Sequence, residues 1–245
     1  MKNILIAAVV IGLSGASASA ADLPVRNYTK APAIVAPYDW SGFHVGANAG
    51  YASSRFNWFF TDDPTAPGPA GLEGPHSSTG AVAGGQIGYN WQMASWVLGV
   101  EAQGNWANLS GQSASQFFPG FINRSRIDAL GFFTGRLGYA WNNTLLYAKG
   151  GAAVSHNTFD YFGAAPGTAP PENRWGGVAG AGLEYGFAPN WSVGVEYLHG
   201  FFGTRRISFV QTGPFGLPSD DISQTLDMVT ARINYRFGGP FGARY

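Results

Sequence analysis

Six charged side chains could form a shared ion-pair network, because each stands in the middle of a weakly charged stretch in which apolar and small or polar residues alternate. Three are acids and three are bases, so their charges can cancel. Carboxylate, ammonium and guanidinium groups held away from water are stable only when they are paired and hydrogen-bonded. We therefore expect one network formed by Glu101, Arg136, Lys149, Glu184, Glu196 and Arg232.

A second possible site would bind hemin or a similar flat, apolar ligand. An iron porphyrin is held by a His or Tyr ligand in an aromatic pocket. His156 is the best placed of the four histidines for this role, beside stretches rich in aromatic residues. We favour the competing interpretation, in which these aromatics extend strands or form a belt at a membrane interface. They are Phe56, Trp58, Phe59, Phe60, Phe117, Phe118, Phe121, Phe159, Tyr161 and Phe162.

Catalytic chemistry has little support in the sequence. The run His76-Ser77-Ser78 places a histidine next to serines, but it lies in a Gly/Pro-rich stretch without an acidic partner at regular spacing. There is no phosphate-binding loop, no HExxH motif and no EF-hand pattern. We expect no enzymatic activity, no cofactor and no metal site.

Two groups of arginines could bind phosphate groups, because guanidinium groups bind phosphate through paired hydrogen bonds. They are Arg124 with Arg126, and Arg205 with Arg206. A solvated loop surface explains them equally well. The formal net charge of the chain is zero, and nothing in its distribution suggests a nucleic-acid partner.

β-Strands are the elements that would position these residues. In the stretch from Trp175 to His199, odd positions are mainly apolar and aromatic, whereas even positions are mainly glycine with Glu184 and Glu196. Successive side chains of a strand point to opposite faces of a sheet. The tight turn Ala188–Asn190 separates the two arms, so this stretch predicts a hairpin with one apolar and one polar face.

The charge content indicates which face of that hairpin meets lipid. Charged residues are 11% of the chain and aromatic residues are 15%, whereas an ordinary soluble domain carries about 25% charged residues. A soluble barrel would cover its outer face with Lys and Glu. A transmembrane barrel instead presents its apolar face to lipid and keeps its polar face inside. We therefore expect the apolar face to contact the membrane.

The same alternation predicts six further strands, which gives the all-β fold class of an eight-stranded, antiparallel, transmembrane up-and-down β-barrel. An even number of strands suits a closed antiparallel barrel. In the fourth strand, Asp128, Thr134 and Arg136 are expected to point inward. The predicted strands span residues 40–52, 80–92, 96–106, 127–141, 144–156, 175–187, 191–199 and 227–237.

The connections alternate between short and long, as expected for periplasmic turns and extracellular loops. Short turns are predicted at 93–95, 142–143 and 188–190, and long loops near 53–79, 107–126, 157–174 and 200–226. Trp96 and Trp106 are ten residues apart, or about 33 Å of strand. A tilted strand of that length projects to about 25 Å, the height of the apolar band, so each tryptophan should lie in one aromatic belt.

The interior of an eight-stranded barrel is only wide enough for side chains to fill it. We therefore interpret the charged network as a structural plug, with an ion path or gate as the alternative. Residues 1–20 have a basic start, an apolar core and the small-residue motif Ala18-Ser19-Ala20, which predicts a cleaved signal peptide. Residues 21–38 are predicted to be a Pro-rich periplasmic tail, and residues 39–245 the barrel.

Four motifs resemble one family: ADLP at 21–24, DWSGFHVGANAGYA at 39–52, LLYAKGG at 145–151 and ARINYRF at 231–237. This is the family of small outer-membrane barrels of alphaproteobacteria, known as outer-membrane immunogenic or surface-antigen proteins, some of which are called hemin-binding proteins. It is similar in architecture to the barrel of OmpA. The sequence departs from the family pattern at His44, where a tyrosine is expected, and in the GGPFGARY extension after Phe237.

The resemblance covers nearly the whole chain after the signal peptide. It implies a location in the outer membrane of a Gram-negative cell, contact with outer-membrane lipids and lipopolysaccharide, and insertion by the outer-membrane assembly machinery. The expected function is that of a non-enzymatic barrel that stabilises the envelope and displays loops at the cell surface. The alternatives are a narrow porin-like channel and a surface receptor for hemin or another ligand.

Overall fold

The computed structural model describes residues 38–62, 70–116, 119–164, 166–211 and 219–237. The predicted signal peptide, the tail as far as residue 37, Phe117, Phe118 and the GGPFGARY extension lie outside the described residues. No helix within these ranges is long and apolar enough to cross a membrane.

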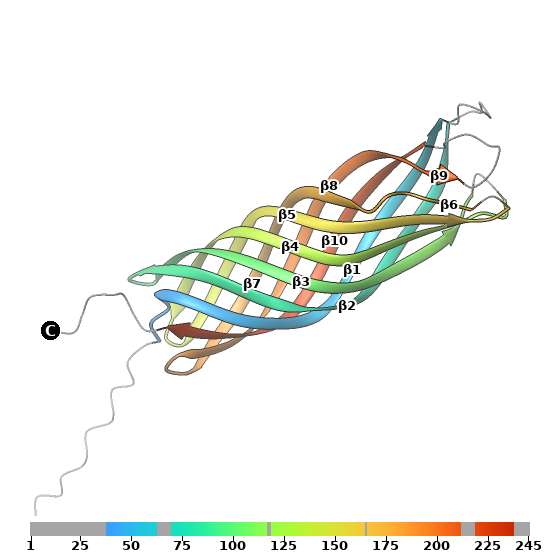
Figure 1. Ribbon diagram of the computed structural model, residues 1–245. Coiled ribbons are helices and arrows are strands. Elements are labelled where there is room, and N and C mark those ends of the chain that lie inside the picture. Colours follow the sequence, from blue (N-terminus) through green and yellow to red (C-terminus); the bar gives the residue numbers. More distant parts are fainter. Residues whose placement is uncertain (1–37, 63–69, 117–118, 165, 212–218, 238–245) are drawn as a thin grey trace, which may run out of the picture. The chain divides into compact units, whose positions relative to one another are not determined.

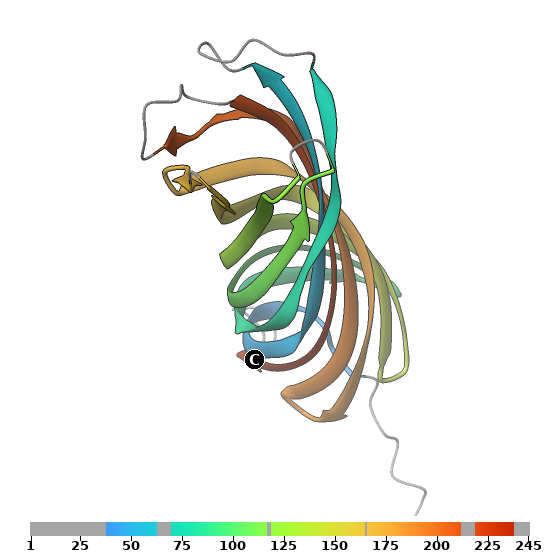
Figure 2. The same cartoon turned by 90° about the vertical axis from the view of Figure 1, so that its right-hand side faces the viewer.

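Eight long strands form a closed antiparallel barrel (Figures 1 and 2), which confirms the predicted fold class. The first and last strands pair with each other from Phe43–Phe237 onward, and the fourth and fifth strands complete the cylinder. The long strands are β1 (Gly42–Asp62), β2 (Gly71–Met93), β3 (Trp96–Ala114), β4 (Ile122–Trp141), β5 (Thr144–Phe162), β7 (Glu172–Ala188), β8 (Trp191–Ser208) and β10 (Ser219–Phe237).

Two short strands lie in the connections at the end of the barrel opposite the tight turns. β6 (Gly167–Thr168) follows β5, β9 (Val210–Gln211) follows β8, and the two pair with each other. At the opposite end, tight turns connect β2 to β3, β4 to β5 and β7 to β8 at the predicted places. Ala94 and Asn142 have positive φ angles of 53° and 52°, as the preferred two-residue hairpin turns require.

The strands continue far beyond their predicted ends, so the predicted extent of the long loops is wrong. β1 runs to Asp62 and β10 begins at Ser219, whereas the sequence placed these boundaries near Ala52 and Asp227. The long strands have 17 to 23 residues, although about 9–11 residues suffice to cross a bilayer. At the other end, β1 begins at Gly42 rather than Trp40, and Trp40 is buried inside the barrel.

The extensions keep the alternation of apolar and polar residues, but here the apolar residues face the inside of the barrel. In β1, Phe56 and Trp58 point inward and are fully buried, while Arg55 and Asn57 point outward. In the half of the barrel nearer the short turns, the apolar residues face outward instead. An apolar interior with a polar exterior is the arrangement of a barrel surrounded by water. The barrel therefore has a membrane half, nearer the short turns, and a water-exposed half. The water-exposed half consists of the strand extensions beyond the predicted strand ends, and we call it the rim.

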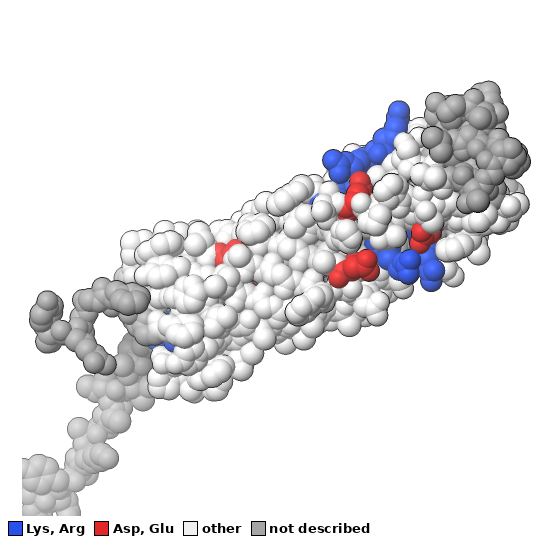
Figure 3. All heavy atoms as spheres, viewed as in Figure 1, with Lys and Arg blue, Asp and Glu red and all other residues white. Residues whose placement is uncertain are grey.

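The outer surface shows the same division. Most charged atoms visible in Figure 3 gather near the end that carries β6 and β9, while the middle of this face is mostly uncharged. Exposed aromatic side chains flank the uncharged band. Trp96 and Trp106 are both exposed, ten residues apart on the outward face of β3.

One predicted inward residue points outward. Asp128 lies at an irregularity of β4, where the pairing with β5 shifts between Ile127 and Ala129. A β-bulge inserts one extra residue and changes the face on which a side chain emerges. Asp128 is consequently exposed, whereas Thr134 and Arg136 are buried in the lumen as expected.

Candidate functional site

The membrane half of the lumen is closed by an ion-pair network centred on Arg232 of β10. One guanidinium nitrogen of Arg232 lies 2.7 Å from a carboxylate oxygen of Glu101, another contacts Glu196, and Nε lies 3.9 Å from Glu184. These acids come from β3, β8 and β7, so one arginine reaches across the barrel. All four side chains are at most 2% exposed.

Lys149 and Arg136 complete the pairing of the three acids. The Lys149 ammonium lies 2.9 Å from Glu101 and 3.0 Å from Glu196. Arg136 lies 3.1 Å from Glu184 and 3.8 Å from Glu101. The structure thus brings all six residues singled out from the sequence into one network, in which every acid contacts at least two bases.

Neutral side chains add further hydrogen bonds to the network. The Tyr147 hydroxyl donates to Glu196 over 2.8 Å, and Ser192 and Asn234 each donate to Glu184 over 3.1 Å. Arg136 donates from Nε to Asn90 over 2.8 Å. His44 Nε2 lies 3.2 Å from Glu101. Buried charges are tolerated when such bonds accompany the ion pairs.

Sequence analysis did not include these neutral partners in the site, although a signal for them exists. His44, Asn90, Ser192 and Asn234 all occupy positions of the inward face, where their types are unusual among glycines. That parity places them in the lumen. It does not show which of them meets which charge, because contacts across the barrel depend on strand tilt and stagger.

Glycines on the inward face provide the space that the network needs. A Cβ atom at Gly99 would lie 2.3 Å from the Asn90 amide oxygen and 3.0 Å from the Arg136 side chain. At Gly194 it would lie 2.7 Å from the Glu184 side chain. The glycine-rich polar face found in the sequence therefore reflects the packing of long charged side chains from neighbouring strands.

Apolar layers close the lumen on both sides of the charged network. Toward the short turns, Tyr38, Trp40, Val97, Ala140, Leu145 and Tyr147 form a buried cluster. On the other side, a larger cluster reaches from the membrane half into the rim and includes Phe56, Trp58, Phe132, Phe159, Phe209 and Ile222. Phe209 stacks on Trp58 with ring centroids 5.5 Å apart, so the segment between β8 and β9 helps to fill the mouth of the barrel.

A polar cluster inside the rim contains the histidine considered for catalysis. His76 Nε2 lies 2.9 Å from Ser125 Oγ, and Nδ1 lies 3.4 Å from Ser113 Oγ. The imidazole therefore contacts Ser125 and Ser113 rather than the neighbouring Ser77 and Ser78. Asn123 donates to Glu73 in the same region. Burial lowers the pKa of His76 to about 4, so the ring is neutral at physiological pH and packs among Phe56 and Trp58.

Two buried carboxyl groups of the rim also have shifted pKa values. Burial raises the pKa of Asp220 to about 8, and the nearby carboxylates of Glu73 and Asp221 add to the shift. Burial likewise raises the pKa of Glu73. The Asp220 Oδ1 atom has no hydrogen-bond partner among the described residues. Within the same ranges, no three His, Asp or Glu side chains are arranged to hold a metal ion.

His156 is not brought together with the aromatic residues considered for hemin binding. It points outward from β5 and donates from Nδ1 to Asn173 over 2.9 Å. Phe56, Trp58 and Phe159 are buried inside the barrel. The imidazole and these rings therefore lie on opposite faces of the sheet, and most of the aromatics belong to extended strands, as the favoured interpretation expects.

The predicted phosphate-binding arginines lie on the outside of the rim in two separate places. On β4, Arg126 lies 3.3 Å from Asp160, and Arg124 lies over the Phe162 ring. On β8, Arg206 lies 3.0 Å from Asp221, and Arg205 lies 3.5 Å from Glu172. In each ion pair the arginine side chain is the more exposed partner.

Comparison with known proteins agrees with this architecture. The model of the outer membrane protein beta-barrel domain matches residues 6–237. The chain belongs to this family. The 31 kDa outer-membrane immunogenic protein of Brucella melitensis is 30% identical over 254 residues, which cover 97% of this chain and 100% of the relative. Outer membrane protein P1 of Coxiella burnetii is 24% identical, covering 81% of this chain and 87% of the relative.

A solved structure shows the same fold. The outer membrane protein OprG of Pseudomonas aeruginosa has a TM-score of 0.50 at 11% sequence identity, and the match covers 80% of this chain and 98% of OprG. Together with the family match, this confirms the resemblance drawn from the sequence motifs. The protein is an outer-membrane β-barrel, with its apolar band in the lipid.

Proposed function

We propose that this outer-membrane protein is a non-enzymatic barrel that stabilises the envelope, displays its rim at the cell surface and does not conduct ions. The observation that carries the proposal is the closed network around Arg232, whose three acids and three bases are almost completely buried. Opening a path through it would separate several buried pairs at once. Loss of one partner from one such pair costs about 3–5 kcal/mol.

A second barrier supports the closed state. The rim interior is filled by Trp58, Phe159, Phe209 and their apolar neighbours, which are almost completely buried. An ion would have to displace this cluster and then cross the charged network. The two barriers differ in chemistry, so a change that opens one leaves the other closed. This favours a plugged barrel over the narrow porin-like channel.

Surface display is supported by the length of the strands and by the relatives. The rim carries polar and charged residues on its outside beyond the aromatic belt, so it extends into water. The Brucella relative is called an outer-membrane immunogenic protein. We propose that the rim is the part of this chain that other molecules at the cell surface contact.

Lipopolysaccharide is the partner that the rim surface fits best. Arg205 and Arg206 expose 56% and 62% of their side chains, next to the outer aromatic belt. Guanidinium groups at that height can bind phosphates of the surrounding lipid headgroups. We also propose that the outer-membrane assembly machinery inserts this barrel, because it belongs to the outer-membrane barrel class.

Planar-bilayer recording tests the main proposal. The purified, folded monomer should show no steady conductance steps, while an open porin in the same bilayers shows that the assay detects channels. Steady conductance steps from the monomer would contradict the plugged barrel and support the narrow porin-like channel.

Hemin binding is tested separately. Titration of the wild type and of His156→Ala should give identical absorbance spectra if His156 plays no part. A hemin spectrum that is lost in the variant would support the receptor alternative.

A further inference from the structure

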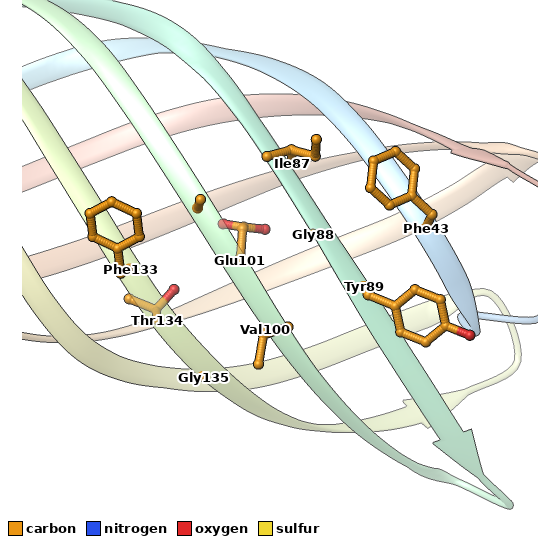
Figure 4. Close-up of a pocket in the computed structure, with 10 residues that line it drawn as sticks. Phe43, Ile87, Gly88, Tyr89, Val100, Glu101, Phe133, Thr134 and Gly135 are labelled. Atoms are coloured by element: carbon orange, nitrogen blue, oxygen red, sulfur yellow. The ribbon is translucent and has the colours of Figure 1, made fainter.

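Two shallow, open grooves lie on the lipid-facing surface of the membrane half, over β1 to β5. The first has a volume of about 520 Å³ and is lined by outward side chains that include Phe43, Ile87, Tyr89 and Phe133. Figure 4 shows the rings of Phe43 and Tyr89 on one side of this groove and that of Phe133 on the other, with Val100 between them.

The second groove continues from the first toward the short turns. It has a volume of about 550 Å³ and shares Val100 and Gly135 with the first. Trp91, Leu98 and Leu137 form its walls. Trp91 stands two residues before the end of β2 at Met93. The grooves therefore form one elongated depression that runs from the aromatic belt of the short-turn side into the apolar band.

The depression offers almost no group that forms hydrogen bonds. The charged residues that border it are Glu101, Arg136 and Lys149, but their side chains are 1–2% exposed and are paired inside the lumen. Apart from the Tyr89 hydroxyl, the outward side chains that line it are hydrocarbon or, for Trp91, indole. A groove of this kind in the hydrocarbon layer is filled by apolar matter, because an unfilled one loses dispersion contacts on its whole lining.

Glycines in the floor of the depression are not required by the packing of the wall. Gly135 and Gly150 lie opposite each other on β4 and β5. A Cβ atom at Gly135 would come no closer than 3.9 Å to any neighbour, and one at Gly150 no closer than 3.4 Å. Inward glycines differ, since a Cβ at Gly99 would lie 2.3 Å from Asn90. Glycine weakens a strand and often marks a position where a ligand approaches the backbone closely.

We propose that this depression is a binding site for one acyl chain of a phospholipid from the leaflet on the short-turn side. The elongated form suits a single flexible chain, and the belt residue Trp91 at its end suits a headgroup at the interface. Its surface is continuous with the apolar band that contacts the bilayer. A bound chain completes the smooth outer surface of the barrel and moves more slowly than the surrounding lipid.

A pair of matched variants tests the site. Gly135→Leu places a side chain in the depression. Gly104→Leu is the control, because Gly104 is also an exposed glycine of the apolar band, its Cβ would meet nothing within 4 Å, and it lines neither groove. Both variants should fold, as judged by migration of unheated and heated samples on a detergent gel. If Gly135→Leu does not fold, Ala148→Leu fills the second groove instead.

The proteins are reconstituted in phosphatidylethanolamine/phosphatidylglycerol vesicles that contain phospholipid spin-labelled on an acyl chain. The wild type and Gly104→Leu should show a motionally restricted, slowly exchanging lipid component, and Gly135→Leu should lose it. Native mass spectrometry of detergent-released protein should show retained phospholipid in the same two proteins.

Three results would overturn the proposal. The first is equal restricted lipid in all three proteins, and the second is equal loss in both variants. The third is a cross-linked dimer of the wild type that Gly135→Leu abolishes, because a second copy of the chain would then occupy the face. When the protein is instead released by detergent from bacterial outer membranes, retention of lipopolysaccharide in place of phospholipid would likewise reject the assigned leaflet.

Discussion

At the scale of single residues, Arg232 decides whether the lumen is stable. It is the one base of the network that contacts all three acids. Its removal would leave carboxylates buried with too few positive partners, which is more costly than the net value of the ion pairs themselves. The network is therefore better understood as a mutually dependent set than as separate salt bridges.

Arg232→Ala should lower the free energy of unfolding by about 3–5 kcal/mol. Arg206→Ala is the control, since Arg206 pairs with Asp221 on the exposed surface of the rim, where an ion pair contributes about 0–1 kcal/mol. Urea unfolding in lipid vesicles, followed by tryptophan fluorescence, measures both. Equal losses in the two variants would contradict the central position of Arg232.

The rim carboxyl Asp220 predicts a dependence of stability on pH. Its pKa is raised to about 8 in the folded protein, against about 4 for an ordinary aspartate. Between these values the folded protein keeps a proton that the unfolded chain releases, so the free energy of unfolding falls as pH rises. Glu73 shifts in the same direction, whereas the lowered pKa of His76 acts only below about pH 6.5.

The melting temperature of the wild type should therefore fall between pH 6.5 and pH 8.5. Asp220→Asn should flatten this fall, because an amide does not ionise. Calorimetry in detergent at the two pH values measures it. A fall of the same size in the variant would show that other groups control the response.

The sequence predicted the six charged residues of the network because inward parity and charge are both visible in it. Their neutral hydrogen-bond partners were harder to predict from the sequence. Asn90 and Asn234 are two of several buried inward amides, so their residue type does not mark them as partners of the charges. Their contacts with Arg136 and Glu184 depend on how far each strand is staggered around the barrel. Asp128 was placed on the wrong face because a bulge of one residue leaves no clear mark in the local pattern.

At the scale of the strands, the main difference from the sequence prediction lies in the rim. Apolar residues on the outward face mark a strand only where the surroundings are lipid. In β10, Ile222 and Leu226 point inward while Asp221 and Thr225 point outward. The alternation is equally regular there, but the apolar residues face the interior and the polar ones face water. The prediction ended each strand near the membrane boundary and assigned the rest to loops.

The rim core predicts a sharp contrast between neighbouring residues. Trp58 is fully buried and stacks on Phe209, whereas Phe59 points outward and is 42% exposed. Trp58→Ala should destabilise the protein by about 3–5 kcal/mol, the usual cost of removing a large buried aromatic side chain. Phe59→Ala should change stability by less than about 1 kcal/mol. Urea unfolding of both variants tests the contrast, and similar values would mean that the rim core contributes little.

At the scale of the whole molecule, the tryptophans report which surface meets lipid. Trp40 and Trp58 are buried inside the barrel, and Trp91, Trp96, Trp106, Trp141, Trp175 and Trp191 are exposed on its outer face. Phospholipids with brominated acyl chains should quench most of the fluorescence and leave a protected fraction. The double variant Trp40→Phe/Trp58→Phe should lose this fraction. Fluorescence that brominated chains leave untouched would contradict the outward assignment of the apolar band.

The reversal between the two halves also fixes how deep the molecule sits in the membrane. A shift of the barrel toward its short-turn end would carry the outward arginines and acids of the rim into hydrocarbon, where the cost of a basic residue rises from about 0–1 kcal/mol near the interface to about 2–4 kcal/mol at the midplane. A shift in the other direction would expose Trp106 and its aromatic neighbours to water. The sheet itself thus holds the barrel at a fixed depth in the membrane, and the rim stands at a constant height above the lipid headgroups.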